Sequence, residues 1–260
     1  MQNASATKTD HDRDIGGPRS LTRVLGLLDT LSDTADGLSL AELSVILNSP
    51  KSSLLALLRP LVAEGYLIHE AGIYRLGSSI YRLAARMLAN WDFPKLIRPY
   101  MVELAEFTGE TVLLGVLNHE AETLTYVEMT EGPHPIRYHV PVGTTRTLYG
   151  TASGRLLLAF AEKNWCDNYV STVVFKTKTA TPTTRTALKR ELNLIRKEGV
   201  STAIDLYVKG LTAIAAPVSN AAGQCIASLT LAGPTDRFKN ELDALQKIVK
   251  DIANKASGIV

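Results

Sequence analysis

The sequence predicts an α+β protein of two domains joined by a helix. Three patterns support this prediction: a helix–turn–helix–hairpin pattern over residues 38–76, an amphipathic helix after residue 77, and strand hairpins mixed with separate helices after residue 94. Strands and separated helices in this order are typical of an antiparallel sheet covered by helices. The 260 residues suffice for two domains that each bury their own core.

The composition limits the class of protein. Hydrophobic residues make up 45% and charged residues 21% of a chain whose formal net charge is +2. This charge is too small to indicate nucleic-acid binding by itself, so a basic surface must be local. Cys166 and Cys225 lack the spacing of metal ligands and favour a reducing compartment, so we expect a cytoplasmic protein without a metal or another cofactor. We expect no membrane partner, since no apolar run reaches the ~18 residues of a membrane helix.

The helices and strands before residue 77 are predicted from helix caps and from the spacing of apolar residues. Residues 1–17 are small, polar and charged, and are expected to form a disordered tail. Ser20 is a candidate N-cap of the first helix, and Ser39 with Glu42 forms a capping box at the second. Pro50 suits the first turn of a third helix, since its missing N–H costs nothing there. Two short strands, 66–69 and 73–76, then predict a hairpin.

A helix is predicted directly after this hairpin. Its apolar stripe is too large for a small domain to bury alone, so we expect it to pair with a second subunit. The expected domains are therefore 18–77 for the first, 78–93 for a linker helix and 94–260 for the second.

The second domain is expected to begin with an amphipathic helix, followed by a strand hairpin. The predicted order is helix 94–108, strands 111–117, 123–129 and 136–140, helices 152–161 and 184–198, strands 211–217 and 225–231, and helix 238–256.

The pattern over residues 38–76 has the shape of a winged helix-turn-helix, which lays a helix in the DNA major groove. The side chains that could bond phosphates or base edges are Arg23, Lys51, Ser52, Ser53, Arg59 and Arg75. We therefore expect double-stranded DNA as a partner. The alternative is that these are ordinary solvated residues of a protein-contact module. The third helix has few base-reading Arg, Asn or Gln residues, so specificity is expected to rest partly on DNA shape.

Several short motifs connect the chain to a known family. They are Leu38–Leu43, Pro50–Ser53, Glu64–Leu67, Tyr74–Gly77, Gly143, Gly150–Ala159, Gly210–Val218 and Gly233–Pro234. Through them the chain resembles the IclR-type bacterial transcriptional regulators over about residues 19–256. The resemblance implies a winged-helix domain, a linker helix and a GAF-like effector domain, assembled as a homodimer or a dimer of dimers. It also implies operator binding that changes when a small-molecule effector binds.

The chain departs from that family in two places. The third helix has Ser53–Ala56 where the family usually has Thr with an aromatic residue or a His-Arg pair, so the resemblance does not extend to the operator sequence. Residues 204–209 are less acidic than is usual, so the effector is expected to differ from that of better-known members.

A candidate ligand site lies at Gly150–Gly154, a small-residue turn that feeds a helix N-terminus and suits a carboxylate. The resemblance places effector contacts at this turn. The residues it implies are Ala152, Ser153, Gly154, Asp205, Leu211, Ala213 and Thr230. Tyr149 and Tyr207 could form an aromatic wall. The alternative is a plain helix cap that binds no ligand.

Enzyme chemistry has weaker support. The 150–154 turn lacks the spacing of a nucleophile elbow, and His134 and His139 have no partner pattern for a metal. Cys225 is expected to be a small core hydrophobe, and Cys166 to be half-exposed but not activated. We therefore predict a ligand-responsive, sequence-specific DNA-binding regulator that is not an enzyme. The alternative is a small-molecule enzyme or sensor whose winged domain mediates assembly.

Overall fold

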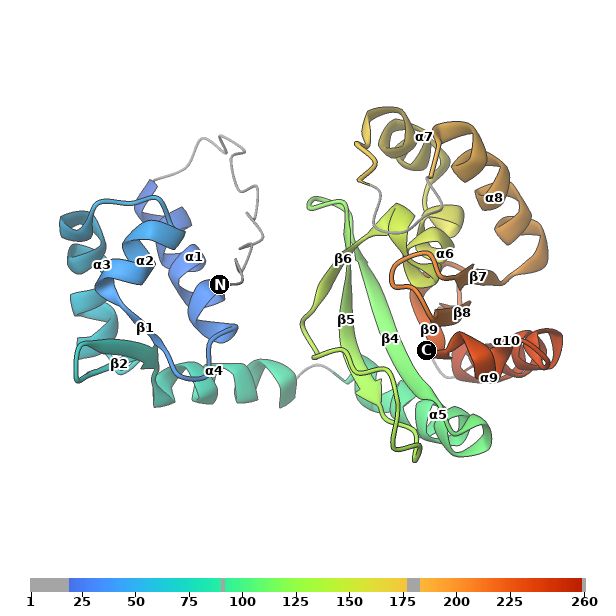
Figure 1. The fold of residues 1–260 in the computed structure, drawn as a ribbon, viewed down its shortest axis with the longest axis horizontal. Coiled ribbons are helices and arrows are strands. Elements are labelled where there is room, and N and C mark those ends of the chain that lie inside the picture. The colour runs from blue at the N-terminus through green and yellow to red at the C-terminus, as the bar shows by residue number, and fades with distance from the viewer. Residues whose placement is uncertain (1–18, 90–91, 177–182, 259–260) are drawn as a thin grey trace. The chain divides into compact units, whose positions relative to one another are not determined.

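The computed structural model describes residues 19–89, 92–176 and 183–258, and the predicted tail over 1–17 lies outside them. The chain divides into two compact units, Met1–Asn90 and Trp91–Val260. Figure 1 shows the helices and strands of both units. Within the described ranges, no helix has the length and apolar character needed to cross a membrane.

The first unit combines helices with a small antiparallel sheet. Its elements are α1 Arg19–Ser32, β1 Leu38–Ser39, α2 Leu40–Ile46, α3 Lys51–Ala63, β2 Leu67–Glu70, β3 Ile73–Leu76 and α4 Ser78–Ala89. The strand order is β1-β3-β2. This is the predicted winged helix-turn-helix, with α3 following α2 after a short turn and the β2–β3 hairpin forming the wing.

Local signals set where the helices of this unit begin. The capping box at α2 is present: the Ser39 backbone N–H donates to the Glu42 carboxylate at 2.8 Å, and the Ser39 hydroxyl accepts from the Glu42 backbone N–H at 3.3 Å. Pro50 is the residue before α3 and gives no side-chain cap. The prediction for Ser20 was wrong, because α1 already includes Arg19 and Ser20 lies inside the helix.

A leucine-rich core fixes which side of α3 faces solvent. The buried residues are Leu27, Leu31, Leu43, Leu54, Leu58, Leu67 and Tyr74. Leu54 and Leu58 contribute the inward side of α3, so Lys51 and Arg59 are left exposed.

The second unit is built on a six-stranded antiparallel sheet with the order β6-β5-β4-β9-β8-β7. Its strands are β4 Thr111–Asn118, β5 Thr123–Thr130, β6 Thr145–Thr147, β7 Ser201–Ile204, β8 Leu211–Ser219 and β9 Cys225–Pro234. Its helices are α5 Phe93–Thr108, the 3-10 turn η1 Leu148–Gly150, α6 Ala152–Phe160, α7 Lys163–Thr172, α8 Arg185–Glu198, α9 Thr235–Phe238 and α10 Leu242–Ser257. The predicted α+β class is confirmed.

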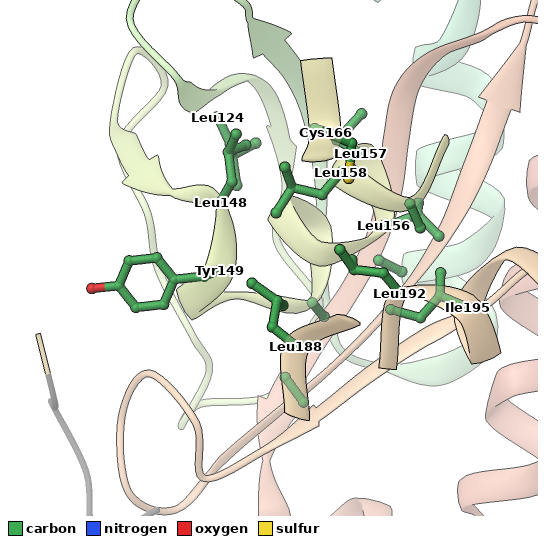
Figure 2. Packing of buried hydrophobic residues seen from close by; sticks show 14 of the residues in the cluster. Leu124, Leu148, Tyr149, Leu156, Leu157, Leu158, Cys166, Leu188, Leu192 and Ile195 are labelled. Carbon is green, nitrogen blue, oxygen red and sulfur yellow. The ribbon is translucent and has the colours of Figure 1, made fainter. Parts of the chain in front are cut away.

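Helices cover both faces of this sheet: α6, α7 and α8 lie on one face, and α5 and α10 on the other (Figure 1). Alternation along the strands supplies both cores. Leu113 faces α6 while its neighbours Val112 and Leu114 face α5 and α10. Figure 2 shows the first of these cores, where leucines of α6 pack against Leu188 and Leu192 of α8.

The structure corrects several predicted elements. Residues 136–140 form no strand, because Pro135 and Pro141 flank the run without ladder N–H groups, and β6 pairs with β5 instead. The predicted final helix is α10, which begins at Leu242 after the short α9. The prediction lacked α7, β6 and β7, which are too short or too polar to give a clear periodic signal.

Candidate DNA-binding and effector sites

The start of α3 combines free backbone donors with polar side chains. The N–H groups of the first turn have no partners within the helix, as at any helix start. Pro50, the residue before α3, supplies no side-chain hydrogen bond to them. Lys51 and Ser52 are exposed beside these donors, and Ser53 is half-buried. Backbone N–H groups, a lysine and hydroxyls together suit a phosphate of DNA.

The other predicted DNA contacts lie on separate elements. Arg59 is exposed on α3 further along the helix, and Arg23 is half-buried on α1. Arg75 lies on β3 of the wing, where its Nε donates to the carbonyl of Asp36 at 2.9 Å. Arg75 therefore ties the wing to the loop before β1, and only the rest of its guanidinium is available to a ligand.

A pocket opens in the second unit between the sheet and the start of α6. It encloses about 400 Å³ of empty space, including its open mouth. The lining residues are Leu113, Tyr126, Tyr138, Arg146, Thr151, Ala152, Ala203, Tyr207, Leu211, Ala213, Thr230 and Ala232. Most of this surface is apolar, as in most small-molecule sites.

Curling of the sheet brings distant strands to this pocket. Arg146 lies on β6 at one edge of the sheet, and Tyr207 follows β7 at the opposite edge. The Arg146 guanidinium nevertheless lies 5.1 Å from the centre of the Tyr207 ring, within the range of a cation–π contact. The two edges of the sheet therefore meet across the pocket.

The pocket contains some of the predicted effector residues and not others. Ala152, Leu211, Ala213 and Thr230 line it. Ser153 is fully buried behind the wall, where its hydroxyl forms hydrogen bonds with the Tyr126 hydroxyl at 3.2 Å and with Thr230 Oγ1 at 2.9 Å.

Gly154 and Asp205 support the pocket from outside its lining. A Cβ at Gly154 would lie 2.3 Å from the carbonyl oxygen of Leu148, so only glycine allows η1 to pack against α6 this closely. The Asp205 carboxylate accepts hydrogen bonds from Gly210 N at 2.7 Å and Thr235 Oγ1 at 3.0 Å. Asp205 thereby closes the loop that carries Tyr207.

Polar contacts fix the start of α6. Thr151 caps the helix, its hydroxyl accepting from Gly154 N at 3.0 Å. Arg155 on the first turn donates to the carbonyl of Tyr149 at 2.7 Å and forms an ion pair with Glu191 of α8. These contacts hold the turn in place while leaving the first N–H groups of the helix, beginning with Ala152, without intrahelical partners.

Sequence reasoning missed Tyr126, Tyr138 and Arg146 as lining residues. Arg146 sits directly opposite the buried Leu124 in the β5–β6 pairing, and an arginine in register with a core leucine is the signal that could have revealed it. Tyr149, predicted as part of an aromatic wall, is not among the lining residues of this pocket. Its ring packs against Phe175, its hydroxyl accepts from Lys176 N at 2.8 Å, and Figure 2 shows it directed away from the leucines of α6.

Burial keeps the phenols of Tyr126 and Tyr138 neutral. It raises the pKa of Tyr126 to about 12, although the hydrogen bond with Ser153 acts in the opposite direction. Burial likewise raises the pKa of Tyr138. At neutral pH, Arg146 is therefore the charged side chain among the described lining residues, and it is positive.

The cysteines and histidines considered for enzyme or metal chemistry lie outside the pocket. Cys166 is 2% exposed, so the expectation of a half-exposed thiol was wrong. Burial raises the pKa of Cys225 to about 12. In the ranges that the structure describes, no three His, Cys, Asp or Glu side chains are grouped to hold a metal ion. His139 instead contacts Glu131 at 2.7 Å on the surface.

Two family models match the chain. The IclR helix-turn-helix domain matches residues 20–70, and the bacterial transcriptional regulator IclR C-terminal model matches residues 85–258. The chain belongs to the IclR family. A curated relative, the HTH-type transcriptional regulator KdgR of Escherichia coli K12, is 29% identical over 235 residues, which cover 89% of this chain and 88% of the relative.

Solved structures share the fold. The IclR transcriptional regulator from Alicyclobacillus acidocaldarius has a TM-score of 0.81 at 24% identity, covering 93% of this chain and 98% of the other. An IclR homolog from Microbacterium hydrocarbonoxydans, solved in complex with 4-hydroxybenzoate, has a TM-score of 0.80 at 22% identity, covering 92% and 98%.

The family assignment decides between the two functions that the sequence left open. The chain is a ligand-responsive DNA-binding transcription regulator, with a helix-turn-helix domain and a C-terminal effector domain, and it is not an enzyme.

Proposed function

We propose that this regulator binds operator DNA through α3 and that a small carboxylic acid in the pocket beside α6 changes its DNA binding. The observation that carries the proposal is the pocket itself: a mostly apolar cavity in the IclR C-terminal domain, lined by Arg146 and by the start of α6. Both features favour an anion. The 4-hydroxybenzoate complex of the Microbacterium relative, a carboxylate ligand, supports this class of effector.

The proposed DNA contacts are those predicted from the sequence. The exposed Lys51 and Ser52 and the first N–H groups of α3 are assigned to phosphates, with Ser53 and Arg59 on the same helix. Arg23 and Arg75 are assigned to flanking backbone. For Arg75, only the guanidinium atoms not bonded to Asp36 take part.

The proposed domain assignment is 18–77 for DNA binding, 78–93 for the linker helix and 94–260 for the effector. We propose a homodimer or a dimer of dimers, because α4 exposes Tyr81 by 63% and Met87 by 63%, apolar area that a second linker helix would cover. Two α3 helices would then occupy major grooves about 34 Å apart. Its action on DNA and its free cysteines fit the cytoplasm.

Effector binding in this proposal acts by population shift. The pocket binds the acid with different affinities in two arrangements of the dimer, and the acid therefore changes the fraction that fits the operator. By linkage, operator binding changes the affinity for the acid by the same factor.

The test is a mobility-shift assay of the full-length protein on the DNA upstream of its own gene, over a salt series, with unrelated competitor DNA. We expect salt-dependent binding that resists the competitor. Lys51→Ala should weaken binding to all DNA and reduce the slope of log K against log salt by about one, because one phosphate contact is lost.

Lys197→Ala is the matched control, since Lys197 is an exposed lysine on α8 of the other unit and should leave the slope unchanged. An unchanged slope in Lys51→Ala would remove Lys51 from the interface. Equal binding to both DNAs would argue against an operator at this position, and no binding at low salt would overturn the proposed role of α3.

A further inference from the structure

We propose that Arg146 is the anion-binding group of the pocket and that the pocket selects an organic acid with one carboxylate and an apolar body. The inference rests on the proposed function in that it takes this pocket as the effector site. It adds the residue that recognises the anion and the chemical class of the rest of the ligand.

The first step is the unbalanced charge of Arg146. Its Nε is buried and has no hydrogen-bond partner among the described residues. Its Nη1 donates to the backbone carbonyl of Thr145 at 2.9 Å, a neutral acceptor. No carboxylate is present among the described lining residues. A guanidinium in this setting lacks a counter-charge, and a carboxylate supplies both the charge and paired acceptors.

The second step is the position of the guanidinium. It lies over the Tyr207 ring, 5.1 Å from its centre, at the point where the two edges of the sheet meet. Opposite Arg146 in the strand pairing, Leu124 is fully buried, so this strand face is directed toward the α6 side of the sheet. The contact with the Tyr207 ring and the direction of this strand face keep the guanidinium at the pocket wall.

The third step concerns the hydroxyls around the start of α6. The Tyr126 hydroxyl is bonded to Ser153, and Ser153 to Thr230, so these hydroxyls satisfy one another. The Thr151 hydroxyl accepts from Gly154 N as the cap of α6. These hydroxyls already have partners within the wall, so a ligand hydroxyl placed against them would lose water without an equivalent replacement.

The rest of the lining favours an apolar ligand body. It consists of aliphatic side chains and the faces of the tyrosine rings. The aliphatic residues are Leu113, Leu211, Ala152, Ala203, Ala213 and Ala232. An apolar lining of this kind is typical of small-molecule sites. Such a lining favours a small apolar body, such as a single ring or a short branched chain, over a nucleotide or a sugar acid.

The experiment measures binding of benzoate, isovalerate, benzamide and gluconate to the full-length protein by titration calorimetry. Benzoate and benzamide differ in charge, whereas gluconate keeps the carboxylate on a polyhydroxylated body. We expect at least one of the two apolar acids to bind, at least tenfold tighter than benzamide and gluconate.

The variant Arg146→Gln should weaken binding of the apolar acid at least tenfold and should bring benzoate and benzamide to similar affinity. Arg146→Lys should restore part of the difference. Arg98→Gln is the matched control, because Arg98 is an exposed arginine of α5 in the same unit whose partner is Glu128. Retained circular dichroism and retained operator binding would show that Arg146→Gln is folded.

The inference would be overturned by gluconate binding more tightly than both apolar acids, or by Arg146→Gln binding the apolar acid as well as the unchanged protein does. Absence of binding by both apolar acids would overturn the ligand class. These outcomes are separate from the proposed function, since operator binding in the mobility shift does not depend on which acid binds.

Discussion

Two arginines near the pocket illustrate how hydrogen-bond satisfaction separates structural from ligand-binding residues. Each guanidinium nitrogen of Arg155 has a partner: the Tyr149 carbonyl, the Glu191 carboxylate and the Thr183 hydroxyl. Arg146 has a buried Nε without a described partner and no counter-charge in the pocket wall. Buried charges are normally paired, so Arg155 stabilises the fold, whereas Arg146 is suited to a charge supplied from outside.

The cysteines are expected to be inert in the folded protein. Burial raises the pKa of Cys225 to about 12 and also raises the pKa of Cys166, which is 2% exposed. At pH 8 a thiol of that pKa is only ~10⁻⁴ ionised, and the thiolate is the reactive form. Alkylation by iodoacetamide, followed by mass spectrometry, should therefore be at least about a hundredfold slower in buffer than in urea.

The single variants Cys166→Ala and Cys225→Ala show which of the two thiols reacts, if any labelling is seen in buffer. Rapid labelling of either thiol in buffer would show that the core over that residue opens readily, contrary to its burial.

At the scale of single elements, α6 depends on a contact with α8 for the position of its first turn. Arg155 is 8% exposed and Glu191 is 29% exposed in their ion pair. Glu191→Gln leaves the arginine buried with neutral partners only, so we expect the free energy of unfolding to fall by about 1–3 kcal/mol. Urea denaturation measures this change.

Glu198→Gln is the control, because Glu198 is an exposed acid at the end of the same helix and should change stability by less than about 0.5 kcal/mol. Equal stability of the two variants would mean that the ion pair contributes little and that core packing alone positions α6.

Helices and strands were predicted correctly where their signal lies in neighbouring residues. The prediction failed where a strand depends on pairing with a distant part of the chain. The capping box of Ser39 and Glu42 and the hairpin of β4 and β5 are both present as predicted. The run at 136–140 has the composition of a strand, but it pairs with no strand, and β5 pairs on that side with β6 over Thr123–Thr125. A strand requires a partner, and the sequence of the strand alone does not contain that information.

At the scale of the whole molecule, the exposed apolar side chains of α4 are expected to form the subunit contact. Met87→Glu places a charge on a side chain that is 63% exposed in the single chain. We expect sedimentation to show a shift from dimer to monomer, and operator affinity to fall at least tenfold because two half-sites are no longer bound together.

Arg86→Ala, at the neighbouring position of the same helix, should keep both the dimer and operator affinity. An unchanged dimer in Met87→Glu would place the subunit contact outside this part of α4.

The sequence by itself determined the two-domain α+β organisation and the helix-turn-helix with its wing, because caps, turns and hydrophobic periodicity act between residues close in the chain. The family came from the resemblance of its short motifs. Through the family motifs the sequence also predicted Ala152, Leu211, Ala213 and Thr230 as effector residues, and these four line the pocket. Only the tertiary structure decided that Arg146 lines the pocket and that Ser153 lies buried behind its wall. The reason is that Arg146 meets Tyr207 across the curled sheet, and that contact depends on the whole strand order.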